Sequence, residues 1–447
     1  MSRKDTTNLW GSKIGFILAT SGAAVGLGNI QKFPYVTSQW GGGAFVLVYL
    51  LCVLFIGLPL ILVEFSLGRS TRLNPKHAIE SLCPSGVWKY FGLLSILTAF
   101  FILSYYIVIA GWTFAYALQM LSGSSLTIHD FSANTGYSLL ASFLTLLTTS
   151  FIVSKGLKSG IETCSKVVMP ILVLLLIGLS LHSLTYPNSI RGLEYFLKPD
   201  FSKLNFEAFM FALSQAFFSL CVGEAVLVTY GSYADKHDNL VSSALSIAMF
   251  DTLIALLAGF VIFPAVFSFQ QTLDQDVGLI FDIMPKIFFQ IPFGSLVGFS
   301  FFSILGFAAI TTCVALLEIP TNYLIKEKTC SRKKAVMIVS FAAWLISLPS
   351  ALSKGSHSFL SQLEISRFKI HGFYDLMDFL WGSLGMLVSG LGITVFVGWK
   401  WGVHAASKEL SHGAPGFKRL IKFWGFHIKY VIPAIIFLIL IHLMMSY

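Results

Sequence analysis

Eleven apolar segments divide this sequence and constrain its fold more than any other feature. Each segment is long enough to cross the hydrocarbon core of a bilayer as a helix. Hydrophobic residues make up 55% of the 447 residues and charged residues only 11%, and the mean hydropathy is +0.78. The segments do not alternate with period two, which argues against a membrane β-barrel. We therefore expect an all-α, polytopic membrane protein with eleven transmembrane helices. The predicted helices cover residues 14–36, 43–67, 90–121, 137–154, 167–184, 206–231, 241–268, 294–325, 335–350, 376–398 and 424–445.

The net charge of +9 has an uneven distribution along the chain. If the N-terminus lies in the cytoplasm, 22 of the 30 lysine and arginine residues fall on the cytoplasmic side. This excess is the positive-inside bias of membrane proteins, so the charge indicates orientation rather than a nucleic-acid partner. We expect a multi-pass protein of the cell (inner) membrane, surrounded by lipid, with a cytoplasmic N-terminus and the C-terminus outside. A monomer and a homodimer both stay open.

Three glycines interrupt the first apolar segment at the depth of the membrane centre: Gly22, Gly26 and Gly28. Glycine has a low helix propensity, so a continuous helix is not expected here. Unpaired backbone groups are tolerated at this depth only where they face a cavity. The freed carbonyls can hold a cation, the freed amides can hold an anion, and Asn29 adds a side-chain oxygen. The alternative is that these glycines only allow helices to pack closely.

The sixth apolar segment repeats this pattern, because small and polar residues from Ser214 to Gly223 precede a buried acid, Glu224. Interrupted first and sixth helices are typical of two five-helix repeats packed in inverted orientation, with the binding site at their interface. We expect one transporter domain over residues 1–447. It would consist of a first repeat at 14–184, an inverted second repeat at 206–398 and an extra helix at 424–445.

Other polar residues lie inside the predicted helices, where each requires a partner. Glu64 is about one and a half helical turns from Arg69 and reads as a structural carboxylate that ties helices together at the inner end. A tyrosine at 105 or 106 can donate to a carboxylate in the interior. Thr311 and Thr312 could offer oxygens to sodium, or bond back to their own helix. Residues 271–292, with Asp274 and Asp276, are too polar to span and read as an outer lid.

Taken together, these motifs resemble the neurotransmitter:sodium symporter family, whose bacterial members are amino-acid transporters. The resemblance covers nearly the whole chain in order. Its motifs are Gly22–Pro34, the turn Gly41–Phe45, Glu64 with Gly68-Arg69, Tyr105-Tyr106, Gln215–Gly223, Thr229–Tyr233, Thr311-Thr312 and Asp378.

The resemblance implies two sodium sites built from oxygen ligands. The first would use the carbonyl of Ala24 and the side chains of Asn29, Ser219 and Asp251, completed by the substrate carboxylate. The second would use the carbonyls of Gly22, Val25 and Ala308 and the hydroxyls of Thr311 and Thr312.

The resemblance also implies a site for an amino acid next to the first sodium. The substrate carboxylate would meet the amides of Leu27 and Gly28 and the hydroxyl of Tyr106. The ammonium would meet carbonyls of Ala24, Phe218 and Ser219. Side-chain contacts would come from Ile102, Phe218, Cys221, Glu224, Thr312 and Leu316. Phe218 would be the inner lid under an outer gate formed by Lys32 and Asp378.

Two departures from the family pattern concern buried acids. Asp251 replaces the usual asparagine beside the first sodium, and Ala255 replaces the serine of chloride-dependent members. A fixed carboxylate would supply the negative charge that chloride otherwise brings, so we expect transport without chloride. The expected cofactor is sodium, at the two sites described above. Glu224 replaces an apolar side chain that faces the substrate. It either recognises a cationic or polar substrate, or is neutral and turned toward a neighbouring helix.

Two further departures concern the gates that would close the site. Lys32 replaces the usual arginine of the outer gate, so a bridge to Asp378 should be looser or mediated by water. The inner-gate ion pair is missing, because Thr7 and Lys326 occupy its positions. A substitute pair of Arg3 or Lys4 with Glu327 is one possibility.

We expect sodium-coupled symport of an amino acid, a neutral one, into the cell by alternating access. One alternative is a cationic or polar substrate recognised by Glu224. Others are a weakly coupled channel, although no ring of carbonyls forms a filter, and a substrate sensor of the same fold. A membrane enzyme is disfavoured, since no nucleophile–base pair or histidine cluster lies at membrane depth.

Overall fold

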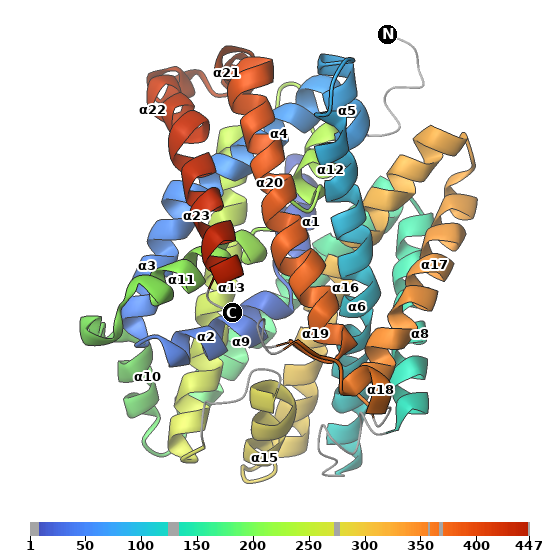
Figure 1. The fold of residues 1–447 in the computed structure, drawn as a ribbon. Helices are drawn as coiled ribbons and strands as arrows, with labels where there is room; N and C mark the ends of the chain where they lie inside the picture. Colours follow the sequence, from blue (N-terminus) through green and yellow to red (C-terminus); the bar gives the residue numbers. More distant parts are fainter. Residues whose placement is uncertain (1–8, 124–133, 272–277, 356–357, 366–369, 446–447) are drawn as a thin grey trace.

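A computed structural model describes residues 9–123, 134–271, 278–355, 358–365 and 370–445. In these ranges the chain is a bundle of long helices with one short antiparallel hairpin, in which Ile365 pairs with Ile370 (Figure 1). The helices of the first half are α1 (Lys13–Ala24), α2 (Phe33–Gln39), α3 (Gly43–Cys52), α4 (Leu58–Thr71), α5 (Pro75–Leu82), α6 (Lys89–Ser122), α8 (Thr135–Ser154), α9 (Thr163–Ser183) and α10 (Ser189–Leu197). The remaining elements are α11 (Phe206–Ser219), α12 (Val226–Ser232), α13 (Leu240–Ser268), α15 (Met284–Phe288), α16 (Gly294–Lys328), α17 (Arg332–Ser353), α18 (Ser358–Ser361), β1 (Glu364–Ile365), β2 (Ile370–His371), α19 (Phe373–Met377), α20 (Met386–Val395), α21 (Val403–Ser411), α22 (Ile421–Phe426) and α23 (Ile432–Met445).

Wider π-helical turns join several of these helices into longer rods. They lie at Gly28–Lys32, Val53–Gly57, Leu157–Glu162, Leu279–Ile283, Asp378–Gly385, Phe396–Gly402 and His427–Val431. Two short 3-10 turns lie at Phe201–Lys203 and Pro415–Arg419.

The described residues contain nine continuous helices that are long and apolar enough to cross a membrane. A tenth span is the bent pair of α1 with Gly28–Gln39, whose two parts meet at 56°. The predicted count of eleven is not confirmed, because residues 206–232 divide into α11 and α12, and neither is long enough to span alone. The predicted lid contains only the short helix α15 and the turn before it; Asp274 and Asp276 lie outside the described residues.

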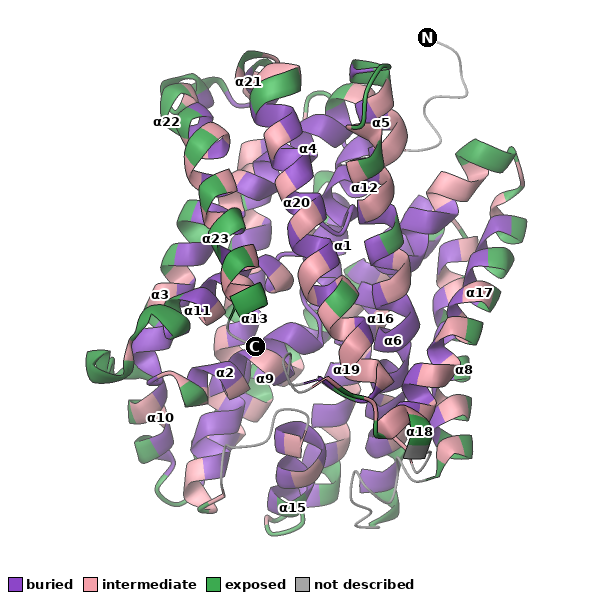
Figure 2. Cartoon of the chain, in the orientation of Figure 1, coloured by how far each residue is buried: buried purple, intermediate pink, exposed green. Residues whose placement is uncertain are grey.

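The central helices are those with the most buried apolar surface. In an apolar 18-residue stretch of α16, 78% is buried, and in the corresponding stretch of α6, 72% is buried. The value for the last helix, residues 421–445, is 22%. Figure 2 shows the same gradient, with buried residues along α1, α6 and α16 and exposed residues along α8, α17 and α23. The exposed residues of these outer helices include large apolar side chains such as Leu144, Phe341 and Phe437. In a bilayer such side chains need no protein partner, which is why the periphery is as apolar as the core.

Candidate functional site

The first helix breaks where the glycine-rich segment predicts. Helix α1 ends at Ala24, and Val25 is extended, with φ −71° and ψ 104°. Helical geometry resumes at Gly28. The break leaves main-chain carbonyls and amides without helix partners in the middle of the bundle.

The second break lies between α11 and α12. Cys221, Gly223 and Ala225 all have positive φ angles, of 52°, 84° and 65°. Only glycine adopts this region without strain, so the surrounding contacts must hold Cys221 and Ala225 in place. One of these contacts is the carboxylate of Glu64, which accepts a 2.7 Å hydrogen bond from the backbone N–H of Gly223. Glu64 thus ties α4 to the second break, as a structural carboxylate should.

The two breaks face each other, as the sequence predicts. The Asn29 amide donates to the Ser219 hydroxyl at 3.0 Å, and the Cys221 thiol donates to the carbonyl of Ala23 at 3.3 Å. Gln215 donates to the carbonyl of Gly28 at 2.9 Å. The exposed main-chain groups of both helices therefore meet in one buried region.

A cavity of about 20 Å³ lies between the breaks, with room for about one water molecule. Ten of the eleven predicted substrate residues line it. The exception is Leu27, whose N–H donates to the Tyr106 hydroxyl at 3.1 Å. Gly26 also lines the cavity, although it is not among the predicted substrate residues. Its position in the glycine-rich break, between Val25 and Leu27, is the feature of the sequence that could have indicated this. The lining consists of Ala24, Gly26, Gly28, Ile102, Tyr106, Phe218, Ser219, Cys221, Glu224, Thr312 and Leu316.

The side chains of the first predicted sodium site are in direct contact. The Asp251 carboxylate accepts from the Asn29 amide at 2.7 Å and from the Ser219 hydroxyl at 2.6 Å. The Tyr49 hydroxyl lies 3.4 Å from the same carboxylate. Asn29 directs its nitrogen, not its oxygen, at Asp251, and its oxygen accepts from the N–H of Gly26 at 3.2 Å. An amide that offers its oxygen to a cation beside Asp251 would have to turn over.

The oxygens of the second predicted sodium site converge between α1 and α16. The Thr312 hydroxyl is 3.4 Å from the carbonyl of Val25 and 3.3 Å from the carbonyl of Ala308. The Thr311 hydroxyl lies 2.9 Å from the same Ala308 carbonyl. Gly22 is also close, because a methyl group at Gly22 would lie 3.2 Å from the β-carbon of Thr311. These neutral oxygens suit a hard monovalent cation.

The predicted gate residues Lys32 and Phe218 lie next to each other, and Phe218 is part of the cavity lining. The ammonium group of Lys32 lies 4.7 Å from the centre of the Phe218 ring. The Tyr105 hydroxyl donates to the Asp378 carboxylate at 2.9 Å, as expected for an interior tyrosine. Among the described residues, no direct ion pair joins Lys32 to Asp378, in keeping with the shorter reach of a single ammonium group.

At the end of the bundle where the sequence predicts the inner gate, a set of contacts joins four helices. The Trp10 indole donates to the carbonyl of Tyr230 at 3.1 Å, and the Tyr233 hydroxyl donates to Glu318 at 2.7 Å. Glu318 also pairs with Arg332. These contacts join the start of α1 to α12, α16 and α17.

Glu327, the acid of the suggested substitute pair, has partners of its own among the described residues. Glu327 pairs with Lys76 and lies 3.6 Å from His77, since α5 packs beside the end of α16 and brings both side chains within reach. The hydrogen bond that Lys76 donates to the Glu327 carboxylate raises the pKa of Lys76. Arg3, Lys4 and Thr7 lie outside the described residues.

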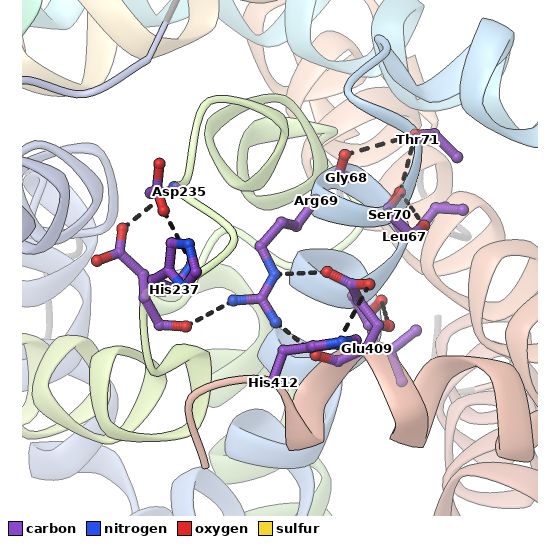
Figure 3. Close-up of polar contacts among 12 residues, drawn as sticks. Leu67, Gly68, Arg69, Ser70, Thr71, Asp235, His237, Glu409 and His412 are labelled. Carbon is purple, nitrogen blue, oxygen red and sulfur yellow. Dashed lines mark hydrogen bonds and ion pairs between the residues drawn. The ribbon is translucent and has the colours of Figure 1, made fainter. Parts of the chain in front are cut away.

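Figure 3 shows Arg69 and its polar contacts, which form a cluster at the same end of the bundle. Its guanidinium donates to the Glu409 carboxylate at 2.6 Å and to the carbonyl of Asp238 at 2.6 Å. The side chain of Arg69 is fully buried. Arg69 therefore joins α4 to α21 and to the loop before α13, rather than pairing with nearby Glu64.

A multi-pass helical protein with two interrupted helices around a small polar cavity belongs to the class of secondary transporters. The comparisons with known proteins agree. The model of the sodium:neurotransmitter symporter family matches residues 7–126 and 122–447, and the chain belongs to this family.

Individual relatives are similar over nearly the whole chain. The sodium-dependent transporter YhdH of Bacillus subtilis is 35% identical over 445 residues, which is 97% of each chain. A sodium-dependent transporter of Haemophilus influenzae is 32% identical, again over 97% of each chain. The crystal structure of MhsT in complex with L-phenylalanine is 37% identical and has a TM-score of 0.88, over 97% of this chain and 99% of that one. This protein is therefore a sodium-coupled solute symporter and not an enzyme.

Proposed function

We propose that this protein carries an amino acid without net charge into the cell together with sodium, by alternating access and without chloride. The observation that carries the proposal is the meeting of the two helix breaks, at Val25–Leu27 and Leu220–Ala225, around one cavity. Backbone amides near Leu27, which the break releases from the helix, could bind a carboxylate, and backbone carbonyls near Ala24 and Phe218 could bind an ammonium group. A zwitterion fits both, and MhsT, which is similar along its whole length, was crystallised with L-phenylalanine.

Sodium would occupy two sites, at Asn29 with Asp251 and at Thr311 with Thr312. A substrate carboxylate that completes the first site would bind more tightly with sodium present, and sodium would bind more tightly with substrate present. The membrane potential would add about 2.3 kcal/mol per charge per 100 mV. Asp251 would take the place of chloride, since its carboxylate accepts hydrogen bonds from the hydroxyl groups of Tyr49 and Ser219.

The proposed orientation follows from the excess of basic residues on one side of the membrane. The N-terminus would lie in the cytoplasm, and the C-terminus would lie on the outer side of the cell (inner) membrane. The protein would act as a monomer or a homodimer of one-domain subunits, each built from the repeats 14–184 and 206–398 with the extra helix 424–445.

The direct test is uptake of labelled amino acids into proteoliposomes with an inward sodium gradient. We expect saturable uptake of at least one amino acid that stops when potassium replaces sodium. Uptake that rises linearly with concentration would indicate a channel. Tight binding without uptake would indicate a sensor, and either result would overturn the symport proposal.

A further inference from the structure

The described part of the chain contains five fully buried acids, and four of them have strong hydrogen-bond donors. Glu64 accepts from a backbone N–H and Asp251 from Asn29 and Ser219. Glu318 pairs with Arg332. The fifth acid is Glu224, which is 3% exposed. The others are Glu64, Glu162, Asp251 and Glu318.

Glu224 has no such donor. Among the described residues no ion pair includes Glu224, and its one side-chain hydrogen-bond partner is a thiol rather than an N–H or O–H group. Its neighbour with a hydrogen to offer is the thiol of Cys221, a weak donor that also lies 3.3 Å from the carbonyl of Ala23. A buried carboxyl group without a good hydrogen-bond partner costs free energy.

Glu224 lines the cavity between the helix breaks. The described lining contains no lysine, arginine or histidine. Three hydroxyl groups lie in the lining, and no described hydrogen bond joins any of them to Glu224. Ser219 donates to Asp251, Thr312 donates to the carbonyl of Ala23, and Tyr106 accepts from the N–H of Leu27. Ile102 and Leu316 supply the apolar part of the wall. The missing donor can therefore come from whatever occupies the cavity.

We propose that Glu224 selects amino acids whose side chain ends in a hydrogen-bond donor over those with a hydrocarbon side chain of similar shape. The inference rests on the proposed amino-acid transport and concerns the side chain of its substrate; a side-chain ammonium as the donor would make the substrate cationic rather than uncharged. The donor can be a neutral hydroxyl or amide, or an ammonium group. A site built to bond a donor rejects an analogue without one, because its own polar group is then left unpaired.

The test is displacement of a labelled amino acid from purified protein in sodium chloride by pairs matched in shape. Asparagine against leucine and threonine against valine test neutral donors, and lysine against norleucine tests an ammonium group. In the wild type we expect the donor member of at least one pair to bind about tenfold more tightly or better. In Glu224→Leu the preference should disappear, while the hydrocarbon member binds equally well or better. These opposite changes cannot arise from misfolding.

Glu224→Gln separates the two kinds of donor, because an amide oxygen still accepts from a neutral group but no longer attracts a cation. Glu194→Leu, at an exposed acid on α10, is the control and should leave all preferences unchanged. No preference for donors in the wild type, or one that persists in Glu224→Leu, would overturn the inference. If no amino acid binds in sodium, the proposed function itself fails.

Discussion

The carboxylate of Glu162 accepts a 2.7 Å hydrogen bond from the backbone N–H of Gly11, 151 positions earlier in the chain. The same carboxylate accepts from the hydroxyl of Ser12 at 3.1 Å and pairs with Lys166 at 2.6 Å. Gly15 makes this approach possible, because a β-carbon there would lie only 2.1 Å from the carboxylate. The start of α1 is thereby attached to the start of α9, at the end where the usual gate residues are missing.

Replacing Glu162 should loosen this attachment. Glu162→Gln substitutes a donor for one acceptor oxygen, and Gly15→Ala forces the carboxylate to move. We expect backbone amides around Gly11 and Ser12 to exchange hydrogen roughly tenfold faster, since a hydrogen bond to a charged group contributes about 1.5–3 kcal/mol. Lys166→Met should have a small effect, because the lysine side chain is 42% exposed. An equal effect of Lys166→Met would contradict a main role for the backbone contact.

Replacing Arg69 should destabilise the protein strongly. Arg69→Met leaves the Glu409 carboxylate and the Asp238 carbonyl without their buried donor, and loss of one partner of a buried pair costs about 3–5 kcal/mol. We expect a clearly lower midpoint of thermal unfolding in detergent. Arg72→Met, a half-buried arginine on the next turn, is the control. Equal midpoints for the two variants would show that the cluster does not stabilise the fold.

Transport should not need chloride. Uptake in sodium gluconate should stay above half of that in sodium chloride. Asp251→Asn removes the negative charge, and adding Ala255→Ser places a hydroxyl one helical turn away, so the double variant should gain a requirement for chloride. A wild type that loses more than half of its rate in gluconate would disprove this assignment of Asp251.

The hydroxyl of Thr311 should contribute to sodium binding. Thr311→Val keeps the shape of the side chain but removes an oxygen that lies 2.9 Å from the carbonyl of Ala308. We expect the sodium concentration for half-maximal substrate binding to rise roughly tenfold. The matched control is Thr148→Val, where an exposed threonine bonds only to its own helix. Unchanged sodium dependence in Thr311→Val would remove this residue from the second site.

The ammonium group of Lys32 should slow substrate release by holding the Phe218 ring over the cavity. Lys32→Met removes the cation but keeps most of the side chain. A partly exposed cation–π contact contributes about 0.5–1 kcal/mol, so dissociation of labelled substrate should be roughly two- to fivefold faster. Lys203→Met, at an exposed lysine near Tyr195, is the control. If release is unchanged, Lys32 does not stabilise the closed position of Phe218.

The sequence by itself determined the membrane class and the positions of both helix breaks. Long apolar runs have no other stable fold in a bilayer, and Gly22–Gly28 and Ser219–Gly223 carry the local signal for interruption. The sequence also predicted ten of the residues that line the cavity, because the motifs of the family occur at matching positions along helices that pack in the same way throughout the family.

Only the tertiary structure decided which polar groups become partners. Arg69 bonds Glu409 rather than nearby Glu64, and Glu327 pairs with Lys76 on α5. Each pairing depends on which helix ends pack side by side. The residues near a side chain in the sequence do not reveal a partner that lies hundreds of positions away. For the same reason, only the tertiary structure shows that Glu224 differs from the other four buried acids, each of which accepts a hydrogen bond from an N–H or O–H group.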